Sequence, residues 1–352
     1  NIYWLIFSRA LLGLGIGGDY PISSVIASEY GNTKDRGKMI ATVFSNQGLG
    51  IILAVAVGIL SVQFLPSDLA WRMILGIGAV PALLVIYFRR KMPETPRFSY
   101  HIKKDINELT KAAEYLNIKT DIKGVSTNYQ HNGERSFVNF IRKYWKYLLI
   151  TASTWFILDI AFYGTGIYSS FISASIVPHL TQENIKTAIF IIGLPYLVGF
   201  PGYFSAVALI DRIGRKLLQI LGFLAMTIIY FLTSFMLKAA SYFVITFLLF
   251  ALSFYAINLG PNTTTFVIPA EIYPTGKRST GHGISAASGK LGAAISTLYL
   301  PLWKLQFGLS AIFLGLGVIS MIGAILTTYL PEPKGISLEE ISNEEIAYAK
   351  SQ

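Results

Sequence analysis

Residues 9–47, RALLGLGIGGDYPISSVIASEYGNTKDRGKMIATVFSNQ, begin inside an apolar run that is typical of a transmembrane helix. Arg9 and Asp19 nevertheless lie within that run. A charge at membrane depth costs roughly 2.5–3.5 kcal/mol on insertion scales, so it usually faces a cavity or a partner. The two charges are ten residues apart, about 15 Å along a helix, which excludes a one-turn ion pair. The stretch favours a polar substrate or proton site over a tightly packed structural ion pair.

Small residues and a proline in the same run support this interpretation. Pro21 frees a backbone carbonyl one turn earlier, close to Asp19. Four glycines between the charges allow close helix packing or the approach of a ligand to the backbone: Gly13, Gly15, Gly17 and Gly18.

The chain of 352 residues has the composition of a polytopic membrane protein. It is 53% hydrophobic and 14% charged, with a mean hydropathy of +0.53, whereas a soluble domain has about 25% charged residues. There is no cysteine, and the four histidines lie without metal-ligand spacing. Because no nucleophile–base set is visible, we expect no enzyme and no bound cofactor or metal.

Nine apolar segments are long enough to cross a bilayer, which predicts an all-α membrane protein. They span roughly residues 2–28, 39–63, 70–90, 146–175, 186–210, 217–237, 241–269, 282–301 and 308–330. A polar stretch with helical character from Lys103 to Leu116 separates the third segment from the fourth. The expected organisation is three helices of a first half in residues 1–90, a linker in 91–145, a six-helix second half in 146–330 and a tail in 331–352.

Lys and Arg residues are shared unequally between the two sides of the predicted membrane. Of the 29, 23 lie in loops on the side of the linker and tail, and four lie on the other side. This bias is typical of cytoplasmic loops, so we expect a multi-pass protein of the cell membrane with a cytoplasmic linker and C-terminus. The net charge of +10 is then a topology signal, and we expect no nucleic-acid partner.

A weak internal repeat relates the two halves. Glu29 precedes Arg36 by seven residues at the end of the first segment, and Glu271 precedes Arg278 by seven at the end of the seventh. Parallel repeats of six helices each are expected in transporters. Only three segments precede the linker, so we expect three N-terminal helices to be absent from this sequence.

The segment after the linker carries a second acid at membrane depth. Trp155, Asp159 and Tyr163 recur every four residues in TASTWFILDIAFYGTG, which places them on one helix face. An acid between an indole N–H and a phenol O–H can bind a hydrogen-bonding ligand and carry a proton. The alternative is a packed acid among interfacial aromatic residues.

Three further polar residues lie in apolar segments. Asn262 follows a predicted helix break at Gly260-Pro261, where transporters often place substrate contacts, although a plain proline kink has the same pattern. Lys290 lies among small residues and needs an acid or an anionic ligand. Gln47 adds an uncharged donor and acceptor. These residues, with Arg9, Asp19 and Asp159, suit an anion that moves with a proton.

Charged residues at the predicted cytoplasmic helix ends are interpreted as a brace around an inner gate. They lie in DRIGRK at 211–216 and at the ends of the repeated segments: Glu29, Arg36, Asp211, Arg212, Arg215, Glu271 and Arg278. PETPR at 93–97 is interpreted as a similar brace, and no role is assigned to the tail.

DRIGRK, PETPR and EIYPTGKRSTGHG resemble motifs of the major facilitator superfamily. GGDYPISSVIASE, TASTWFILDIAFYG and HGISAASGKLGA are more specific and resemble the phosphate:proton symporter family of that superfamily, over residues 1–333. The resemblance implies the twelve-helix fold of the superfamily, of which nine helices are present here. It also implies a phosphate site at Tyr20, Gln47, Trp155, Asp159, Tyr163, Asn262 and Lys290, and a proton route through Asp19 and Arg9.

The expected function is secondary active uptake of inorganic phosphate with protons, by alternating access, with Asp159 also coupled to the proton. The expected partners are phosphate, protons and the lipid bilayer, and the expected state is a monomer. Three alternatives stay open: a major facilitator transporter of a sugar, carboxylate or organic ion, a phosphate sensor that does not transport, and a truncated remnant without activity.

Overall fold

The computed structural model describes residues 1–116, 136–176, 184–238 and 243–344, and every regular element in these ranges is a helix. The first helical group contains α1 (Ile2–Tyr30), α2 (Arg36–Phe64), α3 (Ser67–Gly76) and α4 (Ala79–Arg89). The polar stretch that follows carries α5 (Pro96–Phe98), the π-helical turn η1 (Ser99–Lys103) and α6 (Ile106–Tyr115). The second group contains α7 (Phe137–Ile176), α8 (Ile185–Ile213), α9 (Arg215–Met236), α10 (Phe243–Leu259), α11 (Pro261–Ile272), the 3-10 turn η4 (Thr275–Lys277) and α12 (Arg278–Thr327). The short helix α13 (Leu338–Ile341) lies in the tail.

The predicted apolar segments are confirmed as helices wherever the structure describes them. Eight helices among the described residues are long and apolar enough to cross a membrane. The count is eight rather than nine because the last two predicted segments are the two arms of α12, which turns at Gly308. Gly308 has φ 77° and ψ 170°, a conformation that a side chain would strain.

The predicted break between α10 and α11 is also confirmed. Gly260 has non-helical angles, and Pro261 begins α11 at a position where its missing N–H costs no hydrogen bond. Gly222 of α9 packs against the break so closely that a Cβ on Gly222 would lie 2.6 Å from the Cα of Gly260. Glycine on both sides therefore lets two backbones meet at this depth.

Helix α7 begins at Phe137, inside the stretch that the sequence analysis expected to be linker. Its early turns are amphipathic, and Phe140 and Tyr144 pack against Ile272 and Tyr273 of the second group. Helix α6 begins after Asp105, whose side chain accepts hydrogen bonds from the N–H groups of residues 107 and 108. Expected linker residues 117–135 lie outside the described ranges.

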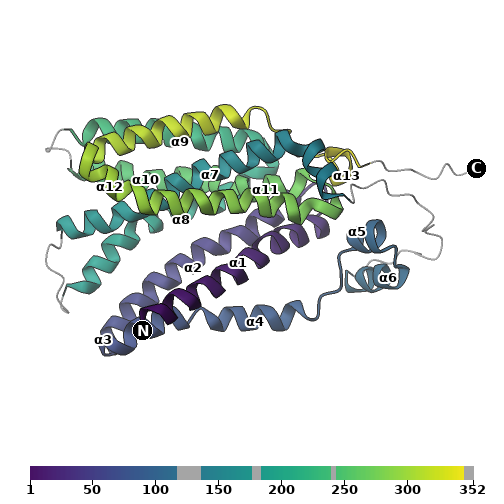
Figure 1. Ribbon diagram of the computed structural model, residues 1–352, viewed down its shortest axis with the longest axis horizontal. Coiled ribbons are helices and arrows are strands. Elements are labelled where there is room, and N and C mark those ends of the chain that lie inside the picture. The colour runs from purple at the N-terminus through teal and green to yellow at the C-terminus, as the bar shows by residue number, and fades with distance from the viewer. Residues whose placement is uncertain (117–135, 177–183, 239–242, 345–352) are drawn as a thin grey trace, which may run out of the picture.

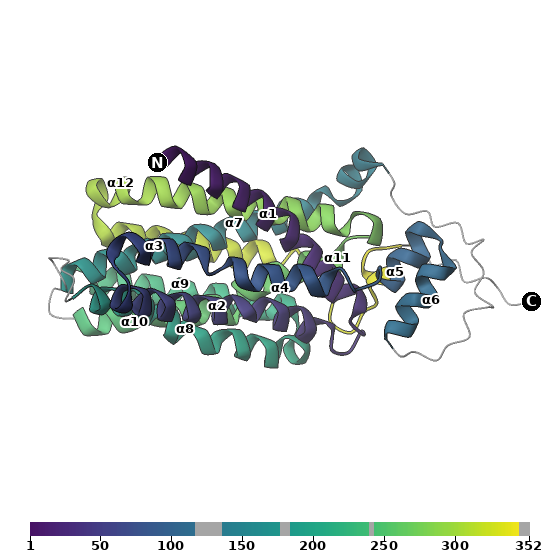
Figure 2. The ribbon, with the colours of Figure 1, turned by 90° about the horizontal axis from the view of Figure 1, so that it is seen from below.

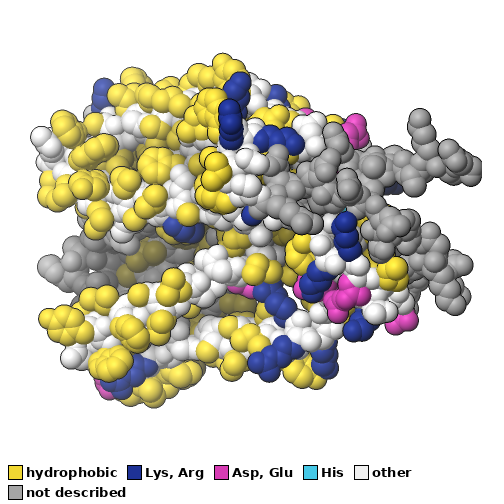
Figure 3. Space-filling view, turned by 45° about the vertical axis from the view of Figure 1, so that its right-hand side comes forward, with side chains coloured by type: hydrophobic (Ala, Val, Ile, Leu, Met, Phe, Trp, Pro, Cys, Tyr) yellow, Lys and Arg dark blue, Asp and Glu magenta, His cyan; other side chains and the backbone are white. Residues whose placement is uncertain are grey.

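The two helical groups lie side by side and meet most closely at the end that carries α5, α6 and α13 (Figures 1 and 2). We call this end the tail end. The main core lies inside the second group, around aromatic residues such as Phe223, Phe254 and Phe313, and extends to Phe44 of α2. Hydrophobic side chains cover most of the face in Figure 3, and most of its charged side chains gather toward the tail end.

Candidate functional site

A buried carboxylate and a lysine form the centre of the site. The Nζ of Lys290 on α12 donates to Oδ2 of Asp159 at 3.1 Å and to the hydroxyl of Tyr163 at 3.0 Å, both on α7. The Asp159 side chain is 3% exposed and that of Lys290 is 49% exposed, so the carboxylate is buried while the ammonium group is partly accessible. Gly289 and Gly292 bring the two helices together, since a Cβ on Gly289 would lie 2.4 Å from Trp155. The arrangement neutralises Asp159 and leaves Lys290 accessible to an anion.

Aromatic rings form the floor beside this pair. Trp155 is buried and contacts Tyr20 of the first group, with ring centroids 5.9 Å apart. Tyr20 packs edge-on against Phe266 at 5.0 Å. His282 lies edge-on to Trp155 at 5.3 Å, and its Nε2 is 3.1 Å from the carbonyl oxygen of Phe266. These contacts join α1 to α7, α11 and α12.

Amide side chains form a second polar cluster. Asn262 Nδ2 lies 3.1 Å from Oε1 of Gln47 and 2.8 Å from Oδ1 of Asn258. The hydroxyl of Tyr203 on α8 donates to the same Oε1 of Gln47 at 2.9 Å. The cluster therefore connects α2 of the first group to α8, α10 and α11 of the second.

A cavity of 540 Å³ lies between the two groups and reaches both clusters. Its lining includes Gln47 from α2, Tyr163 from α7 and Tyr196 from α8. The cavity volume is in the range of small-molecule sites. Polar groups of both halves thus face one cavity.

The predicted proton-route residues are not brought together. Arg9 is exposed on the first turns of α1, while Asp19 is paired with Arg89 at the end of α4. Ser23 joins this pair: Nη2 of Arg89 donates to its Oγ at 2.6 Å, and that Oγ donates to Asp19 at 3.1 Å. Asp159 lies in the separate cluster with Lys290.

Six of the seven predicted gate residues form ion pairs at the tail end, and all of the six except Asp211 are buried. Nη1 of Arg278 lies 2.6 Å from Glu29, and Nε of Arg36 lies 2.7 Å from Glu271. Arg215 binds Glu271 at 2.8 Å and Asp211 at 2.7 Å. The acid of each repeat therefore pairs with the arginine of the other repeat, which fastens the two groups together. The seventh residue, Arg212, offers its backbone carbonyl to Lys334 of the tail.

The C-terminal tail also joins the two helical groups at the tail end, a contact that was not predicted from the sequence. Nη2 of Arg36 donates to the carbonyl oxygen of Ile336 at 2.9 Å, and Glu332 accepts from the first N–H groups of α9. Arg97 of the PETPR stretch binds Glu339 at 2.7 Å. Burial alone would raise the pKa of Glu339, but Arg97 outweighs this effect and holds that pKa below its usual value.

Four residues near the site were missed from the sequence: Tyr203, Asn258, His282 and Arg89. Asn258 could have been found, because it lies four residues before Asn262 in an apolar run. Arg89 was counted only as a loop charge, and nothing local links it to Asp19, which lies 70 residues away. Among the described residues, no group of three or more His, Asp or Glu is placed to hold a metal ion.

The fold and the site define a membrane transporter, in which two helical groups enclose a largely apolar cavity with a few polar groups on its wall. Residues 1–344 match the family of sugar (and other) transporters. The chain is 38% identical to probable inorganic phosphate transporter 1-6 of Arabidopsis thaliana, over 97% of this chain and 72% of that protein. It is 37% identical to inorganic phosphate transporter 1-1 of the same plant, over 97% and 74%.

Solved structures agree on the fold. The proton:xylose symporter XylE, a major facilitator superfamily protein, superposes with a TM-score of 0.75 at 18% identity, covering 91% of this chain and 69% of that one. An inward-open XylE structure from E. coli superposes with a TM-score of 0.56. The chain therefore belongs to the sugar (and other) transporter family, has the fold of the major facilitator superfamily, and counts inorganic phosphate transporters among its relatives at 37–38% identity.

Proposed function

We propose that this protein carries inorganic phosphate across the cell membrane together with protons, by alternating access. The observation that carries the proposal is the half-exposed Lys290 ammonium group, which lies 3.1 Å from a buried carboxylate and 3.0 Å from the hydroxyl of the cavity residue Tyr163. A cation in that position suits a small oxyanion better than a neutral solute. The relatives named as inorganic phosphate transporters point to the same substrate.

The binding chemistry follows from the donors around the cavity. Phosphate oxygens would accept hydrogen bonds from Gln47, Tyr163, Tyr20 and Trp155, and Lys290 would offset their charge. Asn262 would serve the site through Gln47, because its N–H groups are directed at Gln47 and Asn258. Trp155 and Tyr20 supply an indole N–H and a phenol O–H from opposite groups. A bound phosphate would thereby be held by both halves of the transporter.

Asp159 gives the site a means of coupling to protons. In the ion pair, the negative charge of Asp159 offsets the positive charge of Lys290 and so weakens its attraction for an anion. Protonation of Asp159 would release Lys290 to phosphate, and the neutral acid could itself bond a phosphate oxygen. Loss of that proton on the opposite side of the membrane would restore the pair and repel the anion, which promotes release. Asp19, with Arg9, is the second proposed proton-route group.

Alternating access would use the ion pairs at the tail end as the inner gate. Each crossed pair joins one helical group to the other, so opening that end requires both to separate. We place the linker and C-terminus in the cytoplasm because Lys and Arg accumulate on that side. The proposed transporting unit is a monomer.

Competition of uptake tests the substrate. The protein in proteoliposomes should take up labelled phosphate, and unlabelled phosphate or arsenate should compete, because arsenate has nearly the same shape and charge. Xylose, glucose and carboxylates should not compete. Phosphate uptake that is abolished by one of these solutes would overturn the assignment.

A sugar is the second candidate, because the solved relatives with this fold include a xylose symporter. Labelled xylose uptake that phosphate does not inhibit would favour it. The buried Asp159–Lys290 pair is the feature that a neutral sugar does not require.

A further inference from the structure

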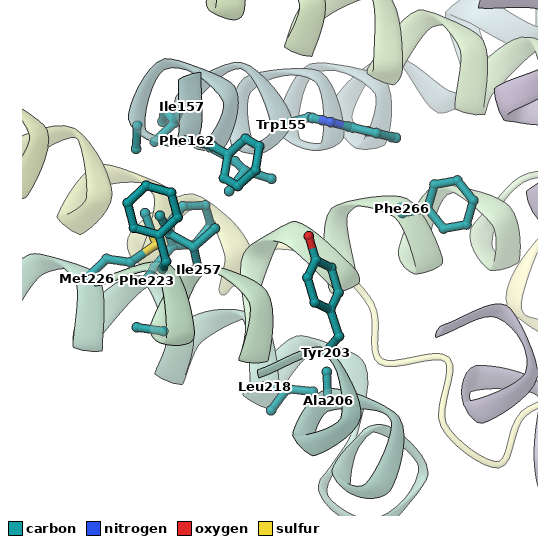
Figure 4. Packing of buried hydrophobic residues seen from close by; sticks show 14 of the residues in the cluster. Trp155, Ile157, Phe162, Tyr203, Ala206, Leu218, Phe223, Met226, Ile257 and Phe266 are labelled. Carbon is teal, nitrogen blue, oxygen red and sulfur yellow. The ribbon is translucent and has the colours of Figure 1, made fainter. Parts of the chain in front are cut away.

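Tyr203 and Asn258 hold the amides of Gln47, a proposed phosphate ligand, and of its neighbour Asn262. Tyr203 and Asn258 are each 2% exposed, so neither lies openly in the cavity. The Tyr203 hydroxyl lies 2.9 Å from Oε1 of Gln47 and 3.2 Å from Nδ2 of Asn262. Figure 4 shows Tyr203 extending from α8, with its hydroxyl directed toward the helix that carries Trp155 and Phe162.

The backbone carbonyl of Gly199 determines how the side-chain amides of Asn258, Asn262 and Gln47 are oriented. Asn258 Nδ2 donates at 3.1 Å to the carbonyl oxygen of Gly199, which can only accept. Asn258 Oδ1 must therefore face the other way, where it accepts from Nδ2 of Asn262 at 2.8 Å. That same nitrogen approaches Oε1 of Gln47 at 3.1 Å. Each amide thus determines the orientation of the next.

The last amide in this series, that of Gln47, lines the cavity proposed for the substrate. Oε1 of Gln47 accepts from both Tyr203 and Asn262, so its two N–H donors are left on the other side of the planar amide. Gln47 lines the cavity, together with Tyr163. A glutamine amide can otherwise turn and present its oxygen, which an anion would repel.

We propose that Tyr203 and Asn258 are positioning residues that keep the Gln47 N–H groups directed into the cavity, which makes the site selective for an oxyanion. This inference rests on the proposed function and adds to it the residues that set the polarity of the site. Tyr203 acts through Gln47 and not by contact with phosphate. Gly199 contributes to this positioning because it lacks a side chain: a Cβ there would lie 3.0 Å from Nδ2 of Asn258.

The first test is Tyr203→Phe, which removes only the hydroxyl. We expect the dissociation constant of labelled phosphate, measured on the purified protein by scintillation proximity, to rise about five- to twentyfold, as for one lost orienting hydrogen bond. Tyr255→Phe is the matched control, because its hydroxyl lies 3.0 Å from Ser205 on the same pair of helices, outside the cluster. It should change the constant less than about twofold.

A double-mutant cycle distinguishes positioning from direct contact. In a Gln47→Ala background there is no amide to orient, so Tyr203→Phe should change the phosphate dissociation constant by less than about twofold. The same fold-change in both backgrounds, or no change in the unmodified protein, would overturn the proposal. A parent protein that binds no phosphate at all would instead refute the proposed function.

Discussion

Placing the Asp159–Lys290 pair at membrane depth costs desolvation free energy. Two charges at membrane depth must each lose hydration, and a buried pair often contributes little net stability. Two of its contacts, from Lys290 to Asp159 and to Tyr163, link α12 to α7 beside the cavity. Such a pair is best explained by function rather than by stability, because a well-packed apolar pair would hold the helices equally well.

Removal of one partner tests that pairing. Lys290→Met should lower stability by about 1–3 kcal/mol, less than for a fully buried pair because the lysine side chain is half exposed. The melting temperature in detergent measures the loss. Asp159→Asn combined with Lys290→Met should recover most of it, whereas Lys111→Met, at a side chain 66% exposed, should be neutral. A double variant no more stable than Lys290→Met would contradict the pairing.

Single residues in the sequence reveal which charges need partners but not which residues those partners are. Lys290 was expected to need an acid or an anionic ligand, and the acid is Asp159, 131 residues away. Asp19 lies on the same helix as Arg9, yet its partner is Arg89. Spacing along one helix reveals a shared face, but contacts between helices depend on packing that one sequence does not encode locally.

Glycine contacts decide how closely the membrane helices approach. Gly222→Ala would place a methyl group 2.6 Å from the backbone of Gly260 and 2.4 Å from the ring of Pro261, so α9 and α11 would have to separate. We expect a loss of about 1–3 kcal/mol, as for overpacking, measured by thermal unfolding in detergent. Gly315→Ala, which meets nothing within 4 Å, is the control and should be neutral or slightly stabilising. Equal effects of the two changes would contradict the packing argument.

The tail contact between Glu339 and Arg97 should respond to acid. Because Arg97 lowers the pKa of Glu339 in the folded protein, the pair contributes fully above the unfolded-state pKa, about 4.3. Its contribution is lost as the pH falls through the lower folded-state pKa. Hydrogen exchange of residues 331–344 should accelerate in that acidic range, and Glu339→Gln should remove this component. An unchanged acid response in Glu339→Gln would refute it.

The sequence predicts where the membrane helices lie, but it does not predict the residues at which they begin and end. Apolar length located all nine segments, and Gly260-Pro261 marked the break between α10 and α11. The start of α7 was predicted too late because its first turns are polar on one face, while Phe140 and Tyr144 on the other pack against the second group. The tail had no apolar run to signal it, because caps and ion pairs hold it, together with a few separated apolar residues such as Leu330 and Ile341.

Crossed ion pairs connect the internal repeat to the whole molecule. Glu29 with Arg278 and Glu271 with Arg36 each join the first group to the second. The repeat itself was visible in the sequence as equal spacing, but the exchange of partners was not. Only the arrangement of the two groups in space pairs each acid with the arginine of the other repeat.

The gate can be tested with introduced cysteines, because the chain contains none. Ser24→Cys places one thiol on the buried face of α1 between Tyr20 and the gate pairs. Adding Glu271→Gln should leave Arg36 without its carboxylate partner and Arg215 with Asp211 alone, which shifts the population toward an open tail end. Labelling by a membrane-impermeant maleimide should then accelerate at least about tenfold. Glu94→Gln, at an exposed pair with Lys103, is the control. Equal labelling rates in all three proteins would exclude this gate.

The central claim is that movement of phosphate is coupled to protons through Asp159. The most direct measurement is uptake of labelled phosphate into proteoliposomes under an imposed inward proton gradient, which is then collapsed with an ionophore. We predict accumulation that requires the gradient in the parent protein and gradient-independent, slow equilibration in Asp159→Asn. Accumulation that persists after the gradient collapses, or gradient-driven uptake that Asp159→Asn leaves intact, would contradict the account.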